Sequence, residues 1–362
     1  MTSAHKRYDT RIFQKECRSL SERGYEVYLI VNDEKKNEII DKVNIISTET
    51  LIKNRYERFF KSHKLLWKKM QEIDAELYHF HDPDLLPMAL KMKKQGKKVI
   101  FDSHENVREN IKDKEYIPKV MRKIISAIYS VYENNILKKI DAVIGVTPEQ
   151  MILLERIGNN ATMITNYPEI VNNVKENQGG TREGICFAGG ISPMWLHETI
   201  LDAIEGTNIK YKLCGPVEKK YLEKLEKHKA WKQVEYLGMI KHEEVIKVLN
   251  SSIAGIALLK YLNSTGKIGT LGNTKIFEYM RAGIPLIATD FVLWKDIIEK
   301  YNCGICVNIE NNIEIKKAIK FMIENPIEAQ KMGQNGRKIF LSQYNWKTQV
   351  EKLFRLYSKI IN

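Results

Sequence analysis

The stretch NTKIFEYMRAGIPLIATD, from Asn273 to Asp290, decides the fold because it joins a helix, a sharp turn and a buried strand. Asn273 is a good N-cap residue, since its side chain accepts a hydrogen bond from a first-turn amide, and Gly272 before it lets the backbone approach a ligand closely. Gly283 and Pro285 end the helix. The apolar run PLIATD that follows indicates a buried strand.

The helix in this stretch has two different sides. At about 100° per residue, an apolar stripe is made of Ile276, Phe277 and Met280, and the opposite side is made of Thr274, Glu278 and Arg281. A helix start offers unpaired amides and a partial positive charge, which suits a phosphate. A carboxylate one turn further along, such as Glu278, could then accept hydrogen bonds from a ribose diol. The alternative is an ordinary surface helix on which Glu278 is only solvated.

The same stretch resembles the nucleotide-sugar-binding helix of family 4 glycosyltransferases, which are retaining enzymes of the GT-B architecture. Their usual motif has two Glu residues separated by seven others, followed by a small-Gly-hydrophobic-Pro turn. Glu278 matches the second Glu, which the resemblance assigns to the donor ribose, whereas Thr270 stands at the first Glu position. A branch of the family with the pattern Pro-Asn/Thr-Lys-Leu-Phe-Glu-Tyr-Met is more similar to this chain. The resemblance covers almost the whole sequence and is strongest over residues 235–310.

Length and composition indicate a folded protein with two domains. The chain has 362 residues, of which 43% are hydrophobic and 28% charged. No window approaches the ~18 uninterrupted apolar residues of a membrane span, and the N-terminus lacks the apolar segment of a signal peptide, so we expect a cytoplasmic protein. Five cysteines, an odd number, favour reduced core thiols over disulfides. The pair Cys303 and Cys306 lacks the second Cys or His pair that a zinc site needs, so we interpret it as structural.

The formal net charge of +13 is spread along the chain, with +6 in residues 1–166 and +7 in the rest, which gives no focused nucleic-acid surface. One local concentration runs from Lys53 to Lys69, where seven cations and one acid alternate with Phe59, Phe60 and Trp67. Such a helix suits an anionic membrane surface, and a solvated basic face is the equally weighted alternative.

The first half alternates helical and strand patterns, which predicts a parallel, doubly wound sheet. We expect a helix over residues 10–23 ended by Gly24, and strands at Tyr25–Val31, Leu77–His81, Lys98–Asp102 and Ala142–Val146. Only Met1–Ala4 is left for a first strand, so either that strand is truncated or the true start lies upstream. Residues 105–140 are helical and basic, and we expect them on the acceptor-binding face.

Histidines follow two neighbouring strands of this predicted sheet. The first strand end reads YHFHDPD, with His79, His81 and Asp82, and the second reads FDSHEN, with Asp102, His104 and Glu105. The ends of adjacent parallel strands meet, so His81 and His104 could face one crevice. A metal site is conceivable, but neither an HExxH helix nor a clear ligand set is present. In the resembling family the His at the position of His104 reaches the transferred sugar and the donor phosphate, while we expect His79 to point inward.

The loop that follows the first residues resembles the corresponding loop and helix of the same branch. Within SAHKRYDTRIFQKE, Asp9 and Arg11 are candidates for acceptor-side or loop-fixing residues.

The second half repeats the alternation, with strands expected in GICFAGG, KYKLCGP, VEYLGMI, IAGIALL and PLIATD. In the family, the turn after the first of these strands carries an Arg and then a Lys that pair with the donor pyrophosphate. Here Gly190 stands at the Arg position and no Lys is near in sequence, so the pyrophosphate charge must be met elsewhere. The candidates are Lys260, Lys267 and Lys275, because a Lys on its long stem can reach a phosphate from several positions.

The resulting prediction is a GT-B protein with two Rossmann-like domains facing a central cleft. The expected parts are an acceptor-side domain at residues 1–166, a linker at 167–183, a nucleotide-sugar-binding domain at 184–342 and a helix at 343–362 that crosses back to the first domain. The expected activity is a metal-independent, retaining transfer of a hexosyl group from a nucleotide-sugar to a saccharide or lipid-linked acceptor, in bacterial-type surface polysaccharide or glycolipid assembly, with no cofactor. The expected location is cytoplasmic, including peripheral association with the inner face of the membrane. A sugar-nucleotide epimerase and a non-catalytic GT-B partner subunit remain the alternatives.

Overall fold

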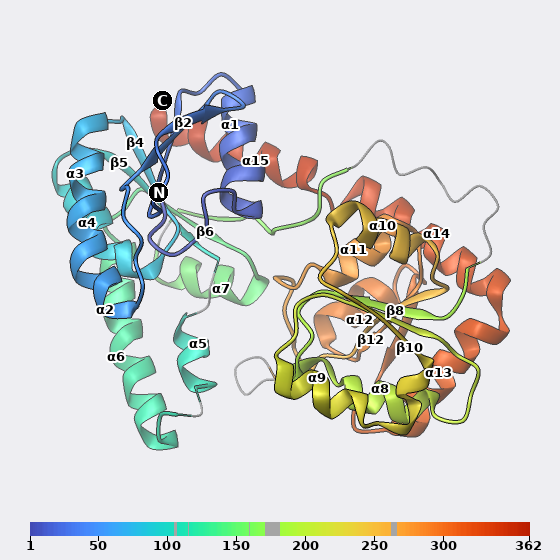
Figure 1. The fold of residues 1–362 in the computed structure, drawn as a ribbon. Coiled ribbons are helices and arrows are strands. Elements are labelled where there is room, and N and C mark those ends of the chain that lie inside the picture. The colour runs from blue at the N-terminus through green and yellow to red at the C-terminus, as the bar shows by residue number, and fades with distance from the viewer. Residues whose placement is uncertain (105–106, 115, 159, 171–181, 262–265) are drawn as a thin grey trace. The chain divides into compact units, whose positions relative to one another are not determined.

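The computed structural model describes residues 1–362 except 105–106, 115, 159, 171–181 and 262–265 (Figure 1). The chain forms two compact units. Unit 1 comprises Met1–Asn166 and Trp346–Asn362, and unit 2 comprises Tyr167–Asn345. Most of the linker expected at residues 167–183 lies outside the described residues. Among the residues that the structure does describe, no helix combines the length and the apolar character needed to cross a membrane.

Unit 1 contains two small sheets, one with the strand order β1-β3-β2 and one with the order β4-β5-β6-β7. All strand pairs in them are parallel except β2 with β3. The strands are β1 (Val27–Val31), β2 (Glu38–Ile40), β3 (Val43–Ser47), β4 (Leu77–Phe80), β5 (Lys98–Ser103), β6 (Ala142–Gly145) and β7 (Ala161–Met163). The helices are η1 (Thr10–Cys17), α1 (Arg18–Glu22), α2 (Arg55–Glu57), η2 (Arg58–Ser62), α3 (His63–Ile73), η3 (Pro83–Leu85), α4 (Leu86–Lys94), α5 (Val107–Lys112), α6 (Lys119–Leu137), α7 (Pro148–Arg156) and α15 (Trp346–Ile361).

The helix expected near the start of the chain is confirmed as η1 followed by α1. Asp9 caps it, because its Oδ1 accepts hydrogen bonds from the amides of Arg11 and Ile12 at 2.8 and 2.9 Å. Gly24, at φ +100°, turns the chain after it, and most side chains would be strained there. Local capping and a glycine stop therefore determine this helix, as the sequence predicted.

Met1–Ala4, the only residues left for a first strand, form no strand. Main-chain bonds still join them to β1, where the Thr2 amide donates to the Ile30 carbonyl at 3.1 Å. At β4 the Met1 ammonium donates to the His79 carbonyl at 2.7 Å, and the Met1 carbonyl accepts a bond from the His81 amide at 3.2 Å. The strands at Val27–Val31, Leu77–Phe80, Lys98–Ser103 and Ala142–Gly145 agree with expectation to within two residues.

Helix α15, from the end of the chain, packs within unit 1. Trp346 donates its indole hydrogen to Ser19 Oγ at 3.0 Å, and Tyr357 packs edge to face on Tyr25. Figure 1 accordingly shows the red α15 beside the blue α1. The apolar face of α15, with Leu353 fully buried, covers the strands of the second sheet.

Unit 2 has one six-stranded parallel sheet with the order β10-β9-β8-β11-β12-β13. Its strands are β8 (Ile185–Ala188), β9 (Tyr211–Cys214), β10 (Val234–Gly238), β11 (Ala254–Ala257), β12 (Leu286–Thr289) and β13 (Gly304–Val307). Its helices are η4 (Pro193–Trp195), α8 (His197–Ile204), α9 (Lys219–Glu226), η5 (Lys229–Gln233), α10 (His242–Asn250), α11 (Lys275–Ala282), α12 (Val292–Ile298), α13 (Asn312–Glu324) and α14 (Pro326–Ser342). Each strand expected here is confirmed, because short apolar runs between glycine turns form buried strands of a parallel sheet.

The five cysteines are free and buried, as the composition predicted. Cys303 and Cys306 lie at β13, where burial raises the pKa of the Cys303 thiol to about 12. A thiol with so high a pKa is a poor nucleophile and a poor metal ligand. The pair therefore belongs to the core.

The basic segment Lys53–Lys69 is largely helical, in α2, η2 and α3. Phe60 is 78% exposed, whereas Trp67 is half-buried against the core with the Lys91 ammonium 3.6 Å from its ring centroid. Trp67 therefore does not serve as the lipid-facing aromatic that the sequence indicated. The side chain of Phe59 lies outside the described residues.

Candidate active site

The order of strands in unit 2 has a switch point between β8 and β11. From β8 the chain continues to β9 on one side, and β11 lies on the other side. The loops after β8 and β11 therefore leave the sheet in diverging directions at its carboxyl edge, which is where open α/β sheets bind ligands. The two loops meet through one backbone bond, from the Lys260 amide to the Met194 carbonyl at 2.9 Å.

Glycines form the end of β8. Gly189 has φ +142°, and Gly215 after β9 lies so close that a Cβ atom on Gly215 would be 1.9 Å from the Gly189 carbonyl oxygen. Gly190 is exposed, with open space where its side chain would be. The backbone at this strand end is therefore bare, and a ligand can approach it closely.

Lys275, the first residue of α11, supplies a positive charge at this glycine turn. Its Nζ donates to the Ala188 carbonyl at 2.9 Å and lies 4.4 Å from the ring centroid of Phe187 and 4.8 Å from that of Trp195. A Cβ atom on Gly189 would be only 1.8 Å from this ammonium, and the φ of +142° at Gly189 would strain any other side chain, so both features favour glycine there. Burial lowers the pKa of Lys275 to about 8. Among the three lysines proposed from the sequence, Lys275 is the one beside the glycine turn.

Lys260 and Lys267 are both exposed. The Lys267 ammonium lies 5.3 Å from the ring centroid of Tyr261, and its carbonyl accepts a bond from the Val292 amide. Part of the loop between them, residues 262–265, lies outside the described residues. No contact of Lys260 or Lys267 in the described part of the chain ties either ammonium to the glycine turn.

The start of α11 differs slightly from the prediction. Thr274, not Asn273, is the N-cap residue and makes no side-chain capping bond, while Asn273 Oδ1 accepts a bond from the Lys275 amide at 3.1 Å. Asn273 still binds a first-turn amide, as expected, but from one position earlier. Gly283 ends the helix in the left-handed region at φ +65°.

Glu278 lies one turn into α11 and is partly exposed, with 29% of its side chain accessible. It pairs with Arg281, whose Nη2 lies 2.6 Å from Glu278 Oε2 and 3.2 Å from Nε2 of His242 on α10. Arg281 lies on the side opposite the apolar stripe, as expected, yet it is only 6% exposed because α10 packs beside it. This pairing fixes the carboxylate of Glu278 while leaving its other oxygen outside that ion pair.

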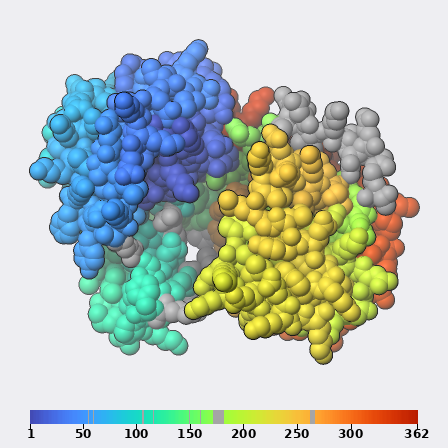
Figure 2. Space-filling view, viewed as in Figure 1, coloured from blue at the N-terminus to red at the C-terminus, as the bar shows by residue number. Residues whose placement is uncertain are grey.

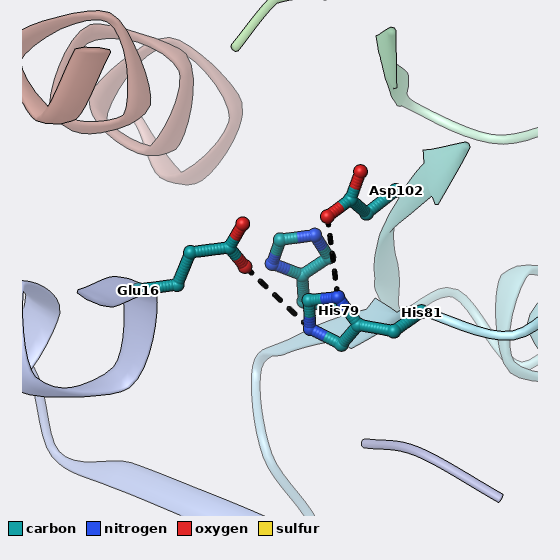
Figure 3. A group of neighbouring side chains, drawn as sticks. All are labelled: Glu16, His79, His81 and Asp102. Atoms are coloured by element: carbon teal, nitrogen blue, oxygen red, sulfur yellow. Dashed lines mark hydrogen bonds and ion pairs between the residues drawn. The ribbon is translucent and has the colours of Figure 1, made fainter. Parts of the chain in front are cut away.

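Unit 1 contains a buried polar network next to His104, and Figure 3 shows four residues of this region, Glu16, His79, His81 and Asp102. Arg11 binds Asp102 through two bonds, Nε to Oδ2 at 2.7 Å and Nη2 to Oδ1 at 3.1 Å, and its Nε lies 3.1 Å from Glu16 Oε1. His81 bridges the carboxylates, with Nδ1 3.3 Å from Asp102 and Nε2 3.6 Å from Glu16. His104 Nδ1 lies 3.7 Å from Asp102 Oδ2. The predicted meeting of His81 and His104 is confirmed, with ring centroids 6.2 Å apart.

The protonation of this network follows from burial and from Arg11. Burial alone would raise the pKa of Asp102, but Arg11 and the neighbouring histidines hold it well below its usual value. Burial raises the pKa of Glu16 well above its ordinary value despite Arg11, and lowers the pKa of His81 to about 4. The network thus keeps Arg11 and Asp102 as a charged pair and leaves His81 neutral at neutral pH, while burial favours the neutral form of Glu16.

His79 points inward, as expected, and its Nδ1 lies 2.9 Å from the hydroxyl of Tyr357. With Glu16, His81 and Asp102 it forms a group whose ligand atoms lie within 4.8 Å of one another, next to a cavity of about 420 Å³ (Figure 3). A metal ion would need a charged Glu16, but Arg11 already supplies the positive charge between the two carboxylates. The chemistry of this group therefore fits a resident guanidinium better than a metal ion.

The alternatives left open for Asp9 and Arg11 can now be separated. Asp9 caps a helix and Arg11 is buried, so both fix local structure. The sequence did not single out His5, whose Nε2 lies 3.3 Å from His104 Nε2 and whose Nδ1 lies 3.0 Å from Asp82 Oδ1. A histidine in the same loop as Asp9 was the available signal. Glu105 lies outside the described residues.

The fold matches solved glycosyltransferases of the GT-B class. Sucrose-phosphate synthase from Thermosynechococcus elongatus superposes with a TM-score of 0.72 and 17% identity, over 99% of this chain and 94% of that one. WaaG, a glycosyltransferase involved in lipopolysaccharide biosynthesis, superposes with a TM-score of 0.68 and 11% identity, over 95% of this chain and 94% of that one. HepE of Anabaena, solved with UDP and glucose, superposes with a TM-score of 0.62 and 14% identity, over 91% of each chain. The predicted GT-B fold, with two Rossmann-like sheets, is confirmed.

Family comparisons agree with this class. The model for glycosyl transferases group 1 matches residues 171–339, and the model for Glycosyltransferase Family 4 matches residues 11–166. Together these matches support a family 4-like glycosyltransferase. An uncharacterized glycosyltransferase of Methanocaldococcus jannaschii is 24% identical over 128 residues, which are 35% of this chain and 31% of that protein. The chain thus aligns with about a third of that curated relative's length.

Proposed function

We propose that this protein is a retaining glycosyltransferase that moves a sugar from a nucleotide-sugar donor to an acceptor hydroxyl, without a metal, in surface polysaccharide or glycolipid assembly. The observation that carries the proposal is the position of Lys275. Its ammonium lies at the bare glycine turn after β8, one helical turn before the partly exposed Glu278. A pyrophosphate at the turn and a ribose at Glu278 would use both groups.

Charge stabilisation in this proposal comes from the protein itself. As the bond between the sugar and the diphosphate breaks, negative charge grows on the leaving phosphate. Lys275 and the first amides of α11 face that charge from a fixed position, which lowers the barrier without reorganisation. The departing phosphate would take the proton of the acceptor hydroxyl.

The acceptor side of the proposal rests on unit 1. His104 is the partly exposed member of a network whose other members are buried, with 14% of its side chain accessible. Asp102 and Arg11 beneath it are positioning residues, because they fix the geometry around His104 and are themselves buried. We propose that His104 contacts the transferred sugar. WaaG, which has a similar fold, is involved in lipopolysaccharide biosynthesis, and this analogy supports a glycolipid or polysaccharide acceptor.

A panel of UDP-, GDP- and ADP-sugars, scored by thermal shift, tests the donor side. At a ligand concentration about 100 times the dissociation constant, binding should add near 2.7 kcal/mol of stability. Glu278→Gln should weaken the binding of the best donor, and Lys267→Met should not. If none of the sugars shifts the unfolding temperature, the donor site is wrong. Conversion of a sugar nucleotide into its epimer without an acceptor would favour the epimerase alternative.

A further inference from the structure

Helix α6 of unit 1 has its apolar side facing outward. Its exposed large side chains are Val120, Met121, Ile124, Ile128, Val131 and Tyr132, and Val120, Ile128 and Val131 are 71%, 65% and 62% exposed. At about 100° per residue these positions fall within an arc of roughly 120°, so they form one continuous stripe. The stripe runs from Val120 to Tyr132 of this 19-residue helix and is therefore about 18 Å long, at about 1.5 Å per residue. Figure 1 shows α6 as a long helix beside α5, and Figure 2 shows its teal-green atoms at the surface of the molecule.

The opposite side of α6 is buried, with the polar Ser126 and Glu133 along it and the core residues Ile136 and Leu137 at its C-terminal end. Glu133, 4% exposed, forms an ion pair with Arg108 of α5, and Ser126 donates its hydroxyl to the Arg108 carbonyl at 2.9 Å. Asn134 accepts a further bond from Arg108. A buried ion pair is costly to break, so these contacts fix the rotation of α6 about its axis. The outward stripe is therefore a built feature of unit 1.

The charges around the stripe are positive. Residues 119–139 contain five cations and one acid, and that acid is the buried Glu133. Lys119 and Lys123 lie at one end of the stripe, and Lys138 and Lys139 at the other, all exposed. Apolar chains bracketed by lysines match the boundary of an anionic bilayer, where the chains enter the acyl region and the ammonium groups meet phosphates. A soluble protein rarely leaves so long an apolar patch to water.

We propose that α6 is an interfacial membrane helix that seats this protein on an anionic lipid surface. The exposed stripe enters the boundary between headgroups and acyl chains, and the four lysines contact lipid phosphates. Lipid binding by α6 does not depend on the proposed function. Only its purpose, to bring the enzyme to a lipid-linked acceptor, rests on that function. The proposed membrane contact is on α6, whereas the sequence had indicated a different segment, Lys53–Lys69.

Sedimentation with vesicles tests the proposal. The full-length protein should sediment with vesicles of equal parts phosphatidylglycerol and phosphatidylcholine, and much less with phosphatidylcholine alone. Ile124→Gln/Ile128→Gln/Val131→Gln changes only exposed positions, and it should lower partitioning at least about tenfold, because burying even one aliphatic side chain is worth about that factor. The matched control is Ile313→Gln/Ile327→Gln, which changes exposed apolar residues of unit 2 and should bind vesicles as the parent does.

Two further measurements make the outcome decisive. Lys61→Gln/Lys64→Gln/Lys68→Gln should retain most of the binding, and if it abolishes binding while the α6 variant does not, the contact lies on the basic segment and the proposal fails. The proposal also fails if parent and α6 variant sediment equally, if the parent does not sediment, or if light scattering shows a dimer that only the α6 variant loses. Donor binding by thermal shift should be the same in every variant, so a failed donor site and a failed membrane helix give different results.

Discussion

The affinity for a nucleotide-sugar should fall as the pH rises from 7 to 9, because Lys275 loses its charge in that range. Burial lowers the pKa of Lys275 to about 8. A lysine with that pKa is roughly nine-tenths protonated at pH 7 and one-tenth at pH 9, whereas an ordinary lysine stays charged throughout. If only the protonated form binds the pyrophosphate, the affinity falls about ninefold, or about 1.3 kcal/mol.

The folding stability of the unliganded protein should change with pH in the opposite direction to the donor affinity. A lysine with a lowered folded-state pKa destabilises the fold while it is charged, so this cost is complete below about pH 8 and disappears as the pH rises toward the unfolded value. Stability from this group therefore rises with pH over the range in which donor binding weakens. Donor binding should also raise the pKa of Lys275, so that protons are taken up when the complex forms at pH 8 to 9.

Isothermal titration of the best donor at five pH values from 7 to 9, in buffers of different ionisation enthalpy, measures both quantities. Lys275→Met keeps the aliphatic stem over the rings of Phe187 and Trp195 but removes the charge. Its affinity should be at least about tenfold lower at pH 7 and nearly independent of pH. Lys267→Met, an exposed position, should follow the parent curve. A flat curve for the parent, or an unchanged slope in Lys275→Met, would refute the reasoning.

Three further predictions concern single side chains. Glu278→Ala should weaken donor binding roughly tenfold in the same titration and should also lower the unfolding temperature, because it removes the ion-pair partner of the buried Arg281; unchanged affinity would remove the ribose assignment. His104→Ala should lower turnover far more than donor affinity, whereas His79→Ala, which loses the bond to Tyr357, should mainly lower stability by about 1 kcal/mol in urea unfolding; similar activity in parent and His104→Ala would make His104 structural. Asp102→Asn leaves Arg11 buried without its carboxylate and should cost about 3 to 5 kcal/mol of unfolding free energy, and a cost below 1 kcal/mol would contradict the buried network.

The sequence predicted the parts of the fold that depend on local pattern. Short apolar runs ending in glycine became the strands of unit 2, and the Asp9 cap and Gly24 set the first helix. The pattern also singled out Glu278 and three lysines as candidates for the proposed donor site. It could not choose among three lysines, because the contact of Lys275 with Ala188 joins residues 87 positions apart and arises only when α11 packs beneath β8.

The features that the sequence did not predict also depend on contacts between elements that are distant in the chain. A helical wheel placed Arg281 opposite the apolar stripe but could not predict its burial, because the wheel contains no information on α10, whose His242 lies beside Arg281. The pattern of residues 119–137 is amphipathic whichever side packs inward. The ion pair of Glu133 with Arg108 and the burial of Ile136 and Leu137 show which side packs inward. A local sequence pattern does not show which residues of other elements will pack against a side chain.

The most direct test of the central claim is to follow the reaction by proton NMR. The protein is incubated with the donor that gives the largest thermal shift and with a simple alkyl glycoside acceptor, and early spectra report the anomeric protons. Our account predicts release of the nucleoside diphosphate and a glycoside with the same anomeric configuration as the donor, with much slower formation by Glu278→Ala. An inverted product, an epimerised sugar nucleotide, or no release from any UDP-, GDP- or ADP-sugar that binds would contradict it.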